Sequence, residues 1–235
     1  MRTLVIGDIH LPFEHPDYLQ FCLDIYSSWN CNCVVFIGDV VDAHALSFWD
    51  TDPHGYSAEE EARVASEHLI EWNQAFGVAK VCIGNHDERH YRKARKAGIP
   101  DRYLRTYNEI YSAPKWEWDF DHRIDGVLYT HGTGCSGKDA AINLAIQKRS
   151  SVAIGHTHSW GGVKYHSNDE SRVFGMNVGC GVDSTKYAFA YGAHMPSRPT
   201  LGAGVVIEGK EAYFEPMGIH KGEPYHRNKS NGKKQ

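Results

Sequence analysis

Five short apolar runs dominate the first two thirds of the chain, and each ends in polar residues that can bind a metal ion. The runs cover residues 3–6, 34–37, 78–83, 127–129 and 152–154. Helical patterns separate several of them, and this alternation is typical of an α/β fold. In open α/β sheets the ligand site lies at the carboxyl ends of the strands. The sequence therefore predicts that the polar residues meet at one edge of a sheet.

The polar blocks offer carboxylate, amide and imidazole groups. They read Gly7-Asp8-Ile9-His10, Gly38-Asp39-Val40-Val41-Asp42, Gly84-Asn85-His86-Asp87, Tyr129-Thr130-His131-Gly132 and Gly155-His156-Thr157-His158. Alternate residues of an extended strand point to the same side, so Asp8 and His10 address one ion or two neighbouring ions, as do His156 and His158. Oxygen and imidazole donors without cysteine suit Mn, Fe or Zn. We therefore expect a metal site at this edge.

The remaining sequence fits one domain with a short tail. A capping-box pattern at Ser57 predicts a helix over the residues that follow, and a second helix is predicted over residues 139–149. From residue 161 onward, short strands such as 172–178 and 201–207 dominate. We expect one domain over residues 1–217 and a polar, basic and mobile tail over residues 218–235.

Charge and cysteine content narrow the class of protein. The net charge of −4 excludes a global basic field for non-specific nucleic-acid binding, although the tail carries five Lys or Arg residues against one Glu. No apolar run approaches the roughly 20 residues of a membrane span, and the chain does not open with a signal-peptide pattern. The six cysteines form no CxxC pair, which indicates reduced thiols. We expect a cytoplasmic protein without a membrane partner.

Taken in this order, the five blocks resemble the DxH, GDxxD, GNHD, H and GHxH motifs of the calcineurin-like metallophosphoesterase superfamily. The resemblance extends over residues 8–158, and the segment Asn177-Val-Gly-Cys180 is similar to a turn found in some members. It implies a sandwich of two β-sheets flanked by helices, in agreement with the α/β pattern. It also implies an enzyme that hydrolyses phosphoesters, either a phosphodiesterase or a phosphatase.

The resemblance further implies a dinuclear centre with two divalent ions, among which Mn is favoured over Fe and Zn. One ion would be held by Asp8, His10, Asp39 and His158, and the other by Asp39, Asn85, His131 and His156, so that Asp39 bridges them. Two neighbouring cations lower the pKa of bound water toward about 7, so the implied nucleophile is a metal-bound hydroxide.

The GNHD block supplies the implied catalytic residues, His86 and Asp87. His86 would protonate the leaving oxygen or stabilise the charge of the phosphoryl group. Asp87 or Asp42 would orient an imidazole ring through a hydrogen bond to the ring nitrogen that does not bind the metal.

Three further residues, Lys138, Arg89 and His44, are candidates for binding substrate. Lys138 ends a GxxxxGK sequence, but Asp139 follows where a P-loop has Ser or Thr, so we interpret this segment as a loop that lines the phosphoesterase pocket. Arg89 begins a basic stretch that extends to Arg105. That stretch is either a contact for a polyanion such as nucleic acid or a solvated helix face.

The substrate class is predicted from what the blocks lack. Protein Ser/Thr phosphatases of the superfamily carry phosphate-binding arginines where this chain has Ala43-His44 and Ile83. We therefore predict a phosphodiesterase or phosphatase that acts on nucleotides or short nucleic acids, and a protein Ser/Thr phosphatase is the alternative. A second alternative is a nucleic-acid- or protein-binding module whose metals are structural. Metal-dependent turnover distinguishes an enzyme from such a module.

Overall fold

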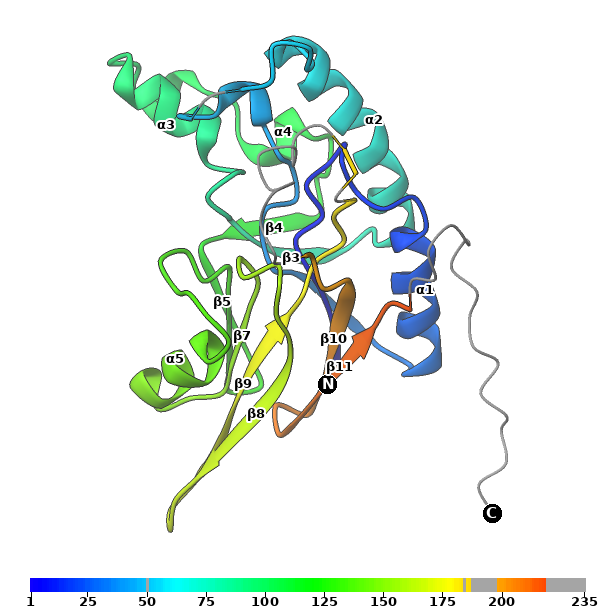
Figure 1. The fold of residues 1–235 in the computed structure, drawn as a ribbon, viewed down its shortest axis with the longest axis vertical. Helices are drawn as coiled ribbons and strands as arrows, with labels where there is room; N and C mark the ends of the chain where they lie inside the picture. The colour runs from blue at the N-terminus through cyan, green and yellow to red at the C-terminus, as the bar shows by residue number, and fades with distance from the viewer. Residues whose placement is uncertain (50, 184, 187–197, 219–235) are drawn as a thin grey trace.

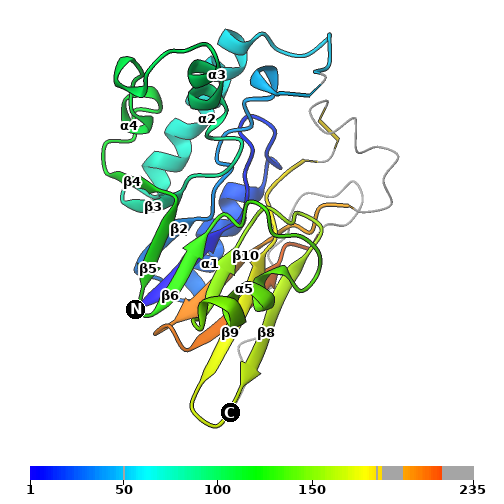
Figure 2. The ribbon, with the colours of Figure 1, turned by 90° about the vertical axis from the view of Figure 1, so that its left-hand side faces the viewer.

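Two β-sheets pack face to face between helices in the computed structural model, which describes residues 1–49, 51–183, 185–186 and 198–218 (Figures 1 and 2). The fold class predicted from the sequence is confirmed. The predicted basic tail lies almost entirely outside the described residues. Among the described helices, none combines the length and the apolar character that a membrane crossing requires.

The first sheet has six strands and a parallel centre. Its order is β11 (Glu211–Pro216), β10 (Gly202–Ile207), β1 (Arg2–Ile6), β2 (Cys33–Phe36), β3 (Ala79–Cys82) and β4 (Trp116–Asp119). The strands β1 to β4 run parallel, whereas β10 pairs antiparallel with both β1 and β11. Because β1, β2 and β3 are parallel, the polar blocks that follow them lie at the same edge.

The second sheet has five strands and, like the first, a parallel centre. Its order is β5 (Asp121–Ile124), β6 (Val127–Thr130), β7 (Val152–Ile154), β9 (Arg172–Val178) and β8 (Gly161–Ser167). The strands β6, β7 and β9 run parallel, and β5 and β8 close the sheet with antiparallel pairs. The blocks after β6 and β7 therefore share one edge of this sheet.

Strand side chains alternate between two cores, which explains why the predicted runs are continuously apolar. On β1, Leu4 and Ile6 pack toward the helices, whereas Val5 packs between the sheets. On β2, Val34 and Phe36 face the helices in the same way. A parallel strand that is buried on both faces needs apolar residues at every position.

Helices cover both outer faces of the sandwich. The core over the first sheet includes residues of α1 (Tyr18–Ser28) and α2 (Ala58–Ala75), and α5 (Ala140–Lys148) packs on the second sheet. The predicted N-cap is present at the start of α2, where the Ser57 side chain accepts a hydrogen bond from Glu60 N. The shorter helices η1 (His44–Leu46), α3 (Arg89–Lys96), η2 (Asp101–Tyr103) and α4 (Tyr107–Ile110) lie at the upper end of Figure 1.

Candidate metal centre

The five polar blocks follow β1, β2, β3, β6 and β7, and the two sheets bring these strand ends together. The backbone turns sharply at three of the predicted ligands. His10, Asp39 and His156 have φ values of 56°, 47° and 63°, in the left-handed region that L-residues rarely adopt. Such conformations cost about 1–3 kcal/mol each and cluster at functional sites, where the surrounding structure holds them in place.

The first group of donor atoms comprises Asp8, His10, Asp39 and His158, whose ligand atoms all lie within 4.8 Å of one another. His158 Nε2 lies 2.9 Å from Asp8 Oδ2 and 3.1 Å from His10 Nε2. His10 Nε2 also lies 3.6 Å from Asp39 Oδ2. Two carboxylates and two imidazoles therefore point at one small volume.

The second group shares Asp39 with the first and adds His131 and His156. His131 Nε2 lies 3.2 Å from Asp39 Oδ2 and 3.2 Å from His156 Nδ1. Asn85 Oδ1 lies 3.1 Å from the same His131 nitrogen. All seven residues predicted as metal ligands are thus assembled in two adjoining groups.

The hydrogen bonds behind the imidazoles fit a bound cation. His10 Nδ1 donates to Asp42 Oδ1 at 2.6 Å, and His131 Nδ1 donates to the Ile37 carbonyl at 3.1 Å. In the neutral form of each ring, Nε2 then keeps a lone pair that faces the donor group, which is the arrangement found in metal-binding histidines. Asp8 Oδ1 is buried and has no hydrogen-bond partner among the described residues. A buried carboxylate oxygen without a donor, beside imidazole nitrogens that can each present a lone pair, favours a bound positive charge.

The electrostatics of the centre favour the same conclusion. Burial opposes protonation of His131, but the Asp39 and Asp8 carboxylates outweigh it and raise the pKa of His131 to about 10. Burial alone would raise the pKa of Asp39, yet His131 and His86 hold it well below its usual value. The carboxylates thus favour a positive charge on the imidazole nitrogens of the centre. A divalent metal ion competes with the proton for the same nitrogens.

Glycines leave the space that the carboxylates occupy. A Cβ at Gly84 would collide with Asp39 Oδ1 and with Asp39 N, and a Cβ at Gly155 would collide with Asp8 Oδ1. Gly38 has a φ of 106°, and a Cβ there would lie 2.7 Å from His131 Nδ1. The glycines of three blocks are therefore steric requirements of the centre.

The third group of titratable atoms, His10, Asp42 and His86, lies beside the other two. Asp42 accepts from His10 Nδ1 at 2.6 Å and lies 2.9 Å from His86 Nδ1. His86 Nε2 lies 3.2 Å from an Arg89 guanidinium nitrogen, whose neighbour donates to the carbonyls of Asp42 and Ala43. The His86 side chain keeps 15% of its surface exposed, so it lies where the centre opens to solvent.

Asp87 lies behind the centre. It is fully buried, and its carboxylate accepts hydrogen bonds from Val41 N at 3.1 Å and Gly84 N at 2.9 Å. Burial and the neighbouring Asp39 raise the pKa of Asp87 to about 7. These contacts join the loops after β2 and β3. Of Asp42 and Asp87, it is Asp42 whose carboxylate contacts imidazole Nδ1 atoms, those of His10 and His86.

The candidate substrate residues lie in three different surroundings. Arg89 contacts His86 at the centre, as described above. His44 is buried, with Nε2 accepting from Asp52 N at 3.3 Å and Nδ1 at 3.8 Å from Asp42 Oδ2. Lys138 is exposed on the loop after β6, where its carbonyl accepts from Asn177 Nδ2 at 3.4 Å.

Sequence reasoning did not identify Glu61 as part of this region. The Glu61 carboxylate is buried on α2 and accepts hydrogen bonds from His44 N at 2.6 Å and Ala45 N at 2.8 Å. It therefore fixes the loop that follows Asp42. The only signal in the sequence is an acidic residue at a position that the helical pattern places on the buried face.

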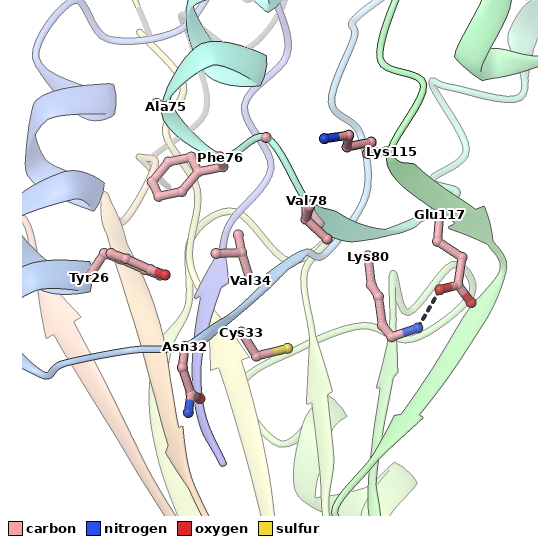
Figure 3. A pocket seen from close by; sticks show the side chains of 12 residues that line it. Tyr26, Asn32, Cys33, Val34, Ala75, Phe76, Val78, Lys80, Lys115 and Glu117 are labelled. Carbon is pink, nitrogen blue, oxygen red and sulfur yellow. Dashed lines mark hydrogen bonds and ion pairs between the residues drawn. The ribbon is translucent and has the colours of Figure 1, made fainter.

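A pocket of about 340 Å³ lies away from the metal centre (Figure 3). Its walls come from the start of β2, the end of α2 and the start of β3, and they include Tyr26, Phe76 and Lys80. Lys80 pairs there with Glu117 across β3 and β4 at 2.5 Å. These are the amino ends of the parallel strands, so the pocket lies at the opposite end of the sheet from the polar blocks.

Comparison with known proteins relates the sequence to a family. A family model described as calcineurin-like phosphoesterase matches residues 1–183. The Gene 54 proteins of Mycobacterium phages D29 and L5 are 25% and 26% identical over 205 residues, covering 76% of this chain and 78% of theirs. A metallophosphoesterase structure from Sphaerobacter thermophilus aligns with a TM-score of 0.45 at 13% identity, covering 94% of this chain and 90% of that one.

Proposed function

Because the chain belongs to the calcineurin-like phosphoesterase family, and is thus a metal-dependent phosphoesterase, we propose that its centre holds two divalent ions and hydrolyses phosphoesters of nucleotides or short nucleic acids. The observation that carries this proposal is that two donor groups share Asp39. A shared carboxylate between two donor sets is what a pair of neighbouring ions requires. The mixture of oxygen and imidazole donors supports Mn, Fe or Zn, and we favour Mn.

In this proposal the ligands divide as the two donor groups do. One ion is assigned to Asp8, His10, Asp39 and His158, and the other to Asp39, Asn85, His131 and His156. Bound ions would supply Lewis-acid charge and a water of lowered pKa. The chain's own contribution is to fix the imidazole tautomers through Asp42 and the Ile37 carbonyl.

His86 is the residue that we assign to the leaving group. Asp42 holds its Nδ1, which leaves Nε2 at the partly exposed side of the centre. From there Nε2 can donate a proton to the leaving oxygen, and the Arg89 guanidinium beside it can bind a phosphoryl oxygen. We assign Asp42, Asp87 and His44 to positioning, because each is buried and contacts imidazole or backbone groups. Lys138 stays a candidate for binding more distant parts of the substrate.

We also propose that the phosphoesterase domain extends to residue 217. The strands β10 and β11 follow the region matched by the family model, yet β10 pairs with the central strand β1 over five residues. Removal of these strands would expose one long edge of β1, so the first sheet depends on them.

The decisive experiment compares a bis-aryl phosphodiester with the corresponding aryl phosphomonoester, after chelation and after Mn readdition. We expect turnover of at least one ester to require the metal, with two ions bound per chain. Substitution Asp39→Asn is expected to lower turnover roughly 100-fold or more, because it weakens both donor groups.

Asn85→Ala tests the second donor group, and Asn143→Ala on the exposed surface of α5 is its matched control. Loss of turnover is expected in the first variant and full turnover in the second. Undiminished turnover by chelated enzyme, or by Asp39→Asn, would show that the proposed centre is wrong. Two bound ions without turnover of either ester would favour a binding module.

A further inference from the structure

The helix α3 and the segment after η1 form a basic, aromatic surface beside the metal centre. Three cations of α3 surround the Phe48 ring: Lys93 Nζ lies 4.6 Å, Arg92 Cζ 4.9 Å and Lys96 Nζ 5.7 Å from its centroid. Trp49 follows and is 85% exposed, while Phe48 is 38% exposed. We call these five residues the α3–Phe48 surface.

The positive charge of this surface is not neutralised within the described part of the chain. Glu88 and Asp101 both pair with Arg95, at 2.9 and 2.7 Å. Among the described residues, no carboxylate lies within ion-pair distance of Arg92, Lys93 or Lys96. A ring face attracts each cation, but three like charges around one ring also repel one another. A bound anion would remove that repulsion.

The position of α3 connects this surface to the metal centre. The helix begins at Arg89, whose guanidinium contacts His86 and the carbonyl of Asp42. From there its eight residues extend over about 12 Å. Figures 1 and 2 show α3 beside η1, the segment that leads to Phe48. Arg89 therefore links the metal centre to the helix that carries the three cations.

The exposed rings suit a ligand that carries bases as well as phosphates. Exposed aromatic side chains within a basic groove are the typical platform for single-stranded nucleic acid, because each base can stack on a ring while the cations follow the backbone. None of the residues of α3 is buried, and the Arg92 and Lys96 side chains are exposed, so they are accessible to a ligand.

We propose that the α3–Phe48 surface binds single-stranded nucleic acid and presents its phosphodiester bonds to the metal centre. This inference rests on the proposed function, which it narrows to an oligonucleotide substrate. Arg92, Lys93 and Lys96 bind backbone phosphates, and a base stacks on Trp49.

Fluorescence anisotropy with a labelled oligothymidylate of about 20 nucleotides tests the proposal directly. The assay uses the full chain with Mn, in an Asn85→Ala background that prevents turnover. The triple variant R92Q/K93Q/K96Q is expected to weaken binding at least tenfold. It should also reduce the slope of log affinity against log salt by about 2, since each contact to a single strand contributes about 0.7. Trp49→Ala is expected to weaken binding about 5- to 150-fold.

The matched control replaces three exposed cations at the other end of the molecule, R123Q/R172Q/K210Q, with the same change in net charge. It should bind like the parent chain. Equal affinity of the two triple variants would overturn the proposal. So would tighter binding of a duplex of the same length, or equally salt-dependent binding of polyglutamate, which would assign the surface to another polyanion.

Turnover separates this proposal from the proposed function. With an intact centre, R92Q/K93Q/K96Q should lower kcat/KM for the oligonucleotide at least tenfold more than kcat/KM for the bis-aryl diester. If the diester is turned over but the triple substitution does not change oligonucleotide binding, the proposed metal centre is retained and the proposed binding surface is wrong. If neither ester nor the oligonucleotide is turned over but oligonucleotide binding depends on the three cations, the binding surface is retained and the proposed catalytic function is wrong.

Discussion

Gly84 has no side chain at a point where a Cβ would displace Asp39 from the centre. A methyl group there would collide with both the carboxylate and the backbone nitrogen of Asp39, the residue shared by the two donor groups. We expect Gly84→Ala to displace Asp39 and to lower metal affinity and turnover about 10- to 100-fold. Metal content by mass spectrometry and diester turnover measure both effects.

The control for this substitution is Gly77→Ala. A Cβ at Gly77 would lie 3.6 Å from Asn73 O, an ordinary van der Waals distance. Metal content and turnover should therefore be unchanged. If Gly84→Ala also binds two ions and turns over normally, Asp39 does not occupy the position that we assign to it.

The three aspartates Asp39, Asp42 and Asp87 show how far residue identity predicts function. Their motifs identified all three as candidates, and the structure brings them together. Their individual tasks follow from contacts that the sequence does not contain: Asp42 accepts from two imidazoles, whereas Asp87 accepts from two backbone amides. Such partners are set by loops that meet only after the sheets have packed, so local patterns cannot distinguish them.

At the scale of elements, strands were easier to predict than helices. The runs before the metal blocks are apolar at every position because both strand faces are buried, and the observed strands lie at the predicted places. The helix α1 was not predicted. Asp17 forms no side-chain cap for it, and neither acidic nor basic residues mark its first and last turns. Its stability comes from packing against the first sheet, which a local pattern does not reveal.

The helix α2 acts on the centre through Glu61. Glu61→Gln replaces one carboxylate oxygen with an amide that donates toward the backbone N–H of His44 or Ala45, so one buried hydrogen bond is lost. We expect the free energy of unfolding to fall by about 1–3 kcal/mol, as measured by urea denaturation. Glu71→Gln, on the exposed side of the same helix, is the control. Equal stability of the two variants would mean that Glu61 does not tether the loop.

At the scale of the whole molecule, the donors come from both sheets. Asp8, His10, Asp39 and Asn85 follow strands of the first sheet, and His131, His156 and His158 follow strands of the second. Ions held between them would join the two halves of the sandwich at their carboxyl edge, so the metals should contribute to the stability of the fold as well as to catalysis. This follows from mass action, because the unfolded chain cannot assemble ligands that are more than 100 residues apart in sequence.

Chelation should therefore lower the melting temperature of the whole protein. With free metal at a thousand times its Kd, binding stabilises the folded state by about 4 kcal/mol. This is the contribution of one ion. For a chain of this size each kcal/mol shifts the melting temperature by about 2–4 °C, so removal of each ion should lower it by about 8–16 °C. Asp39→Asn should melt near the chelated value with or without Mn, because it lacks the shared ligand. If chelation abolishes turnover but leaves the melting temperature of the parent chain unchanged, the ions serve catalysis without joining the sheets.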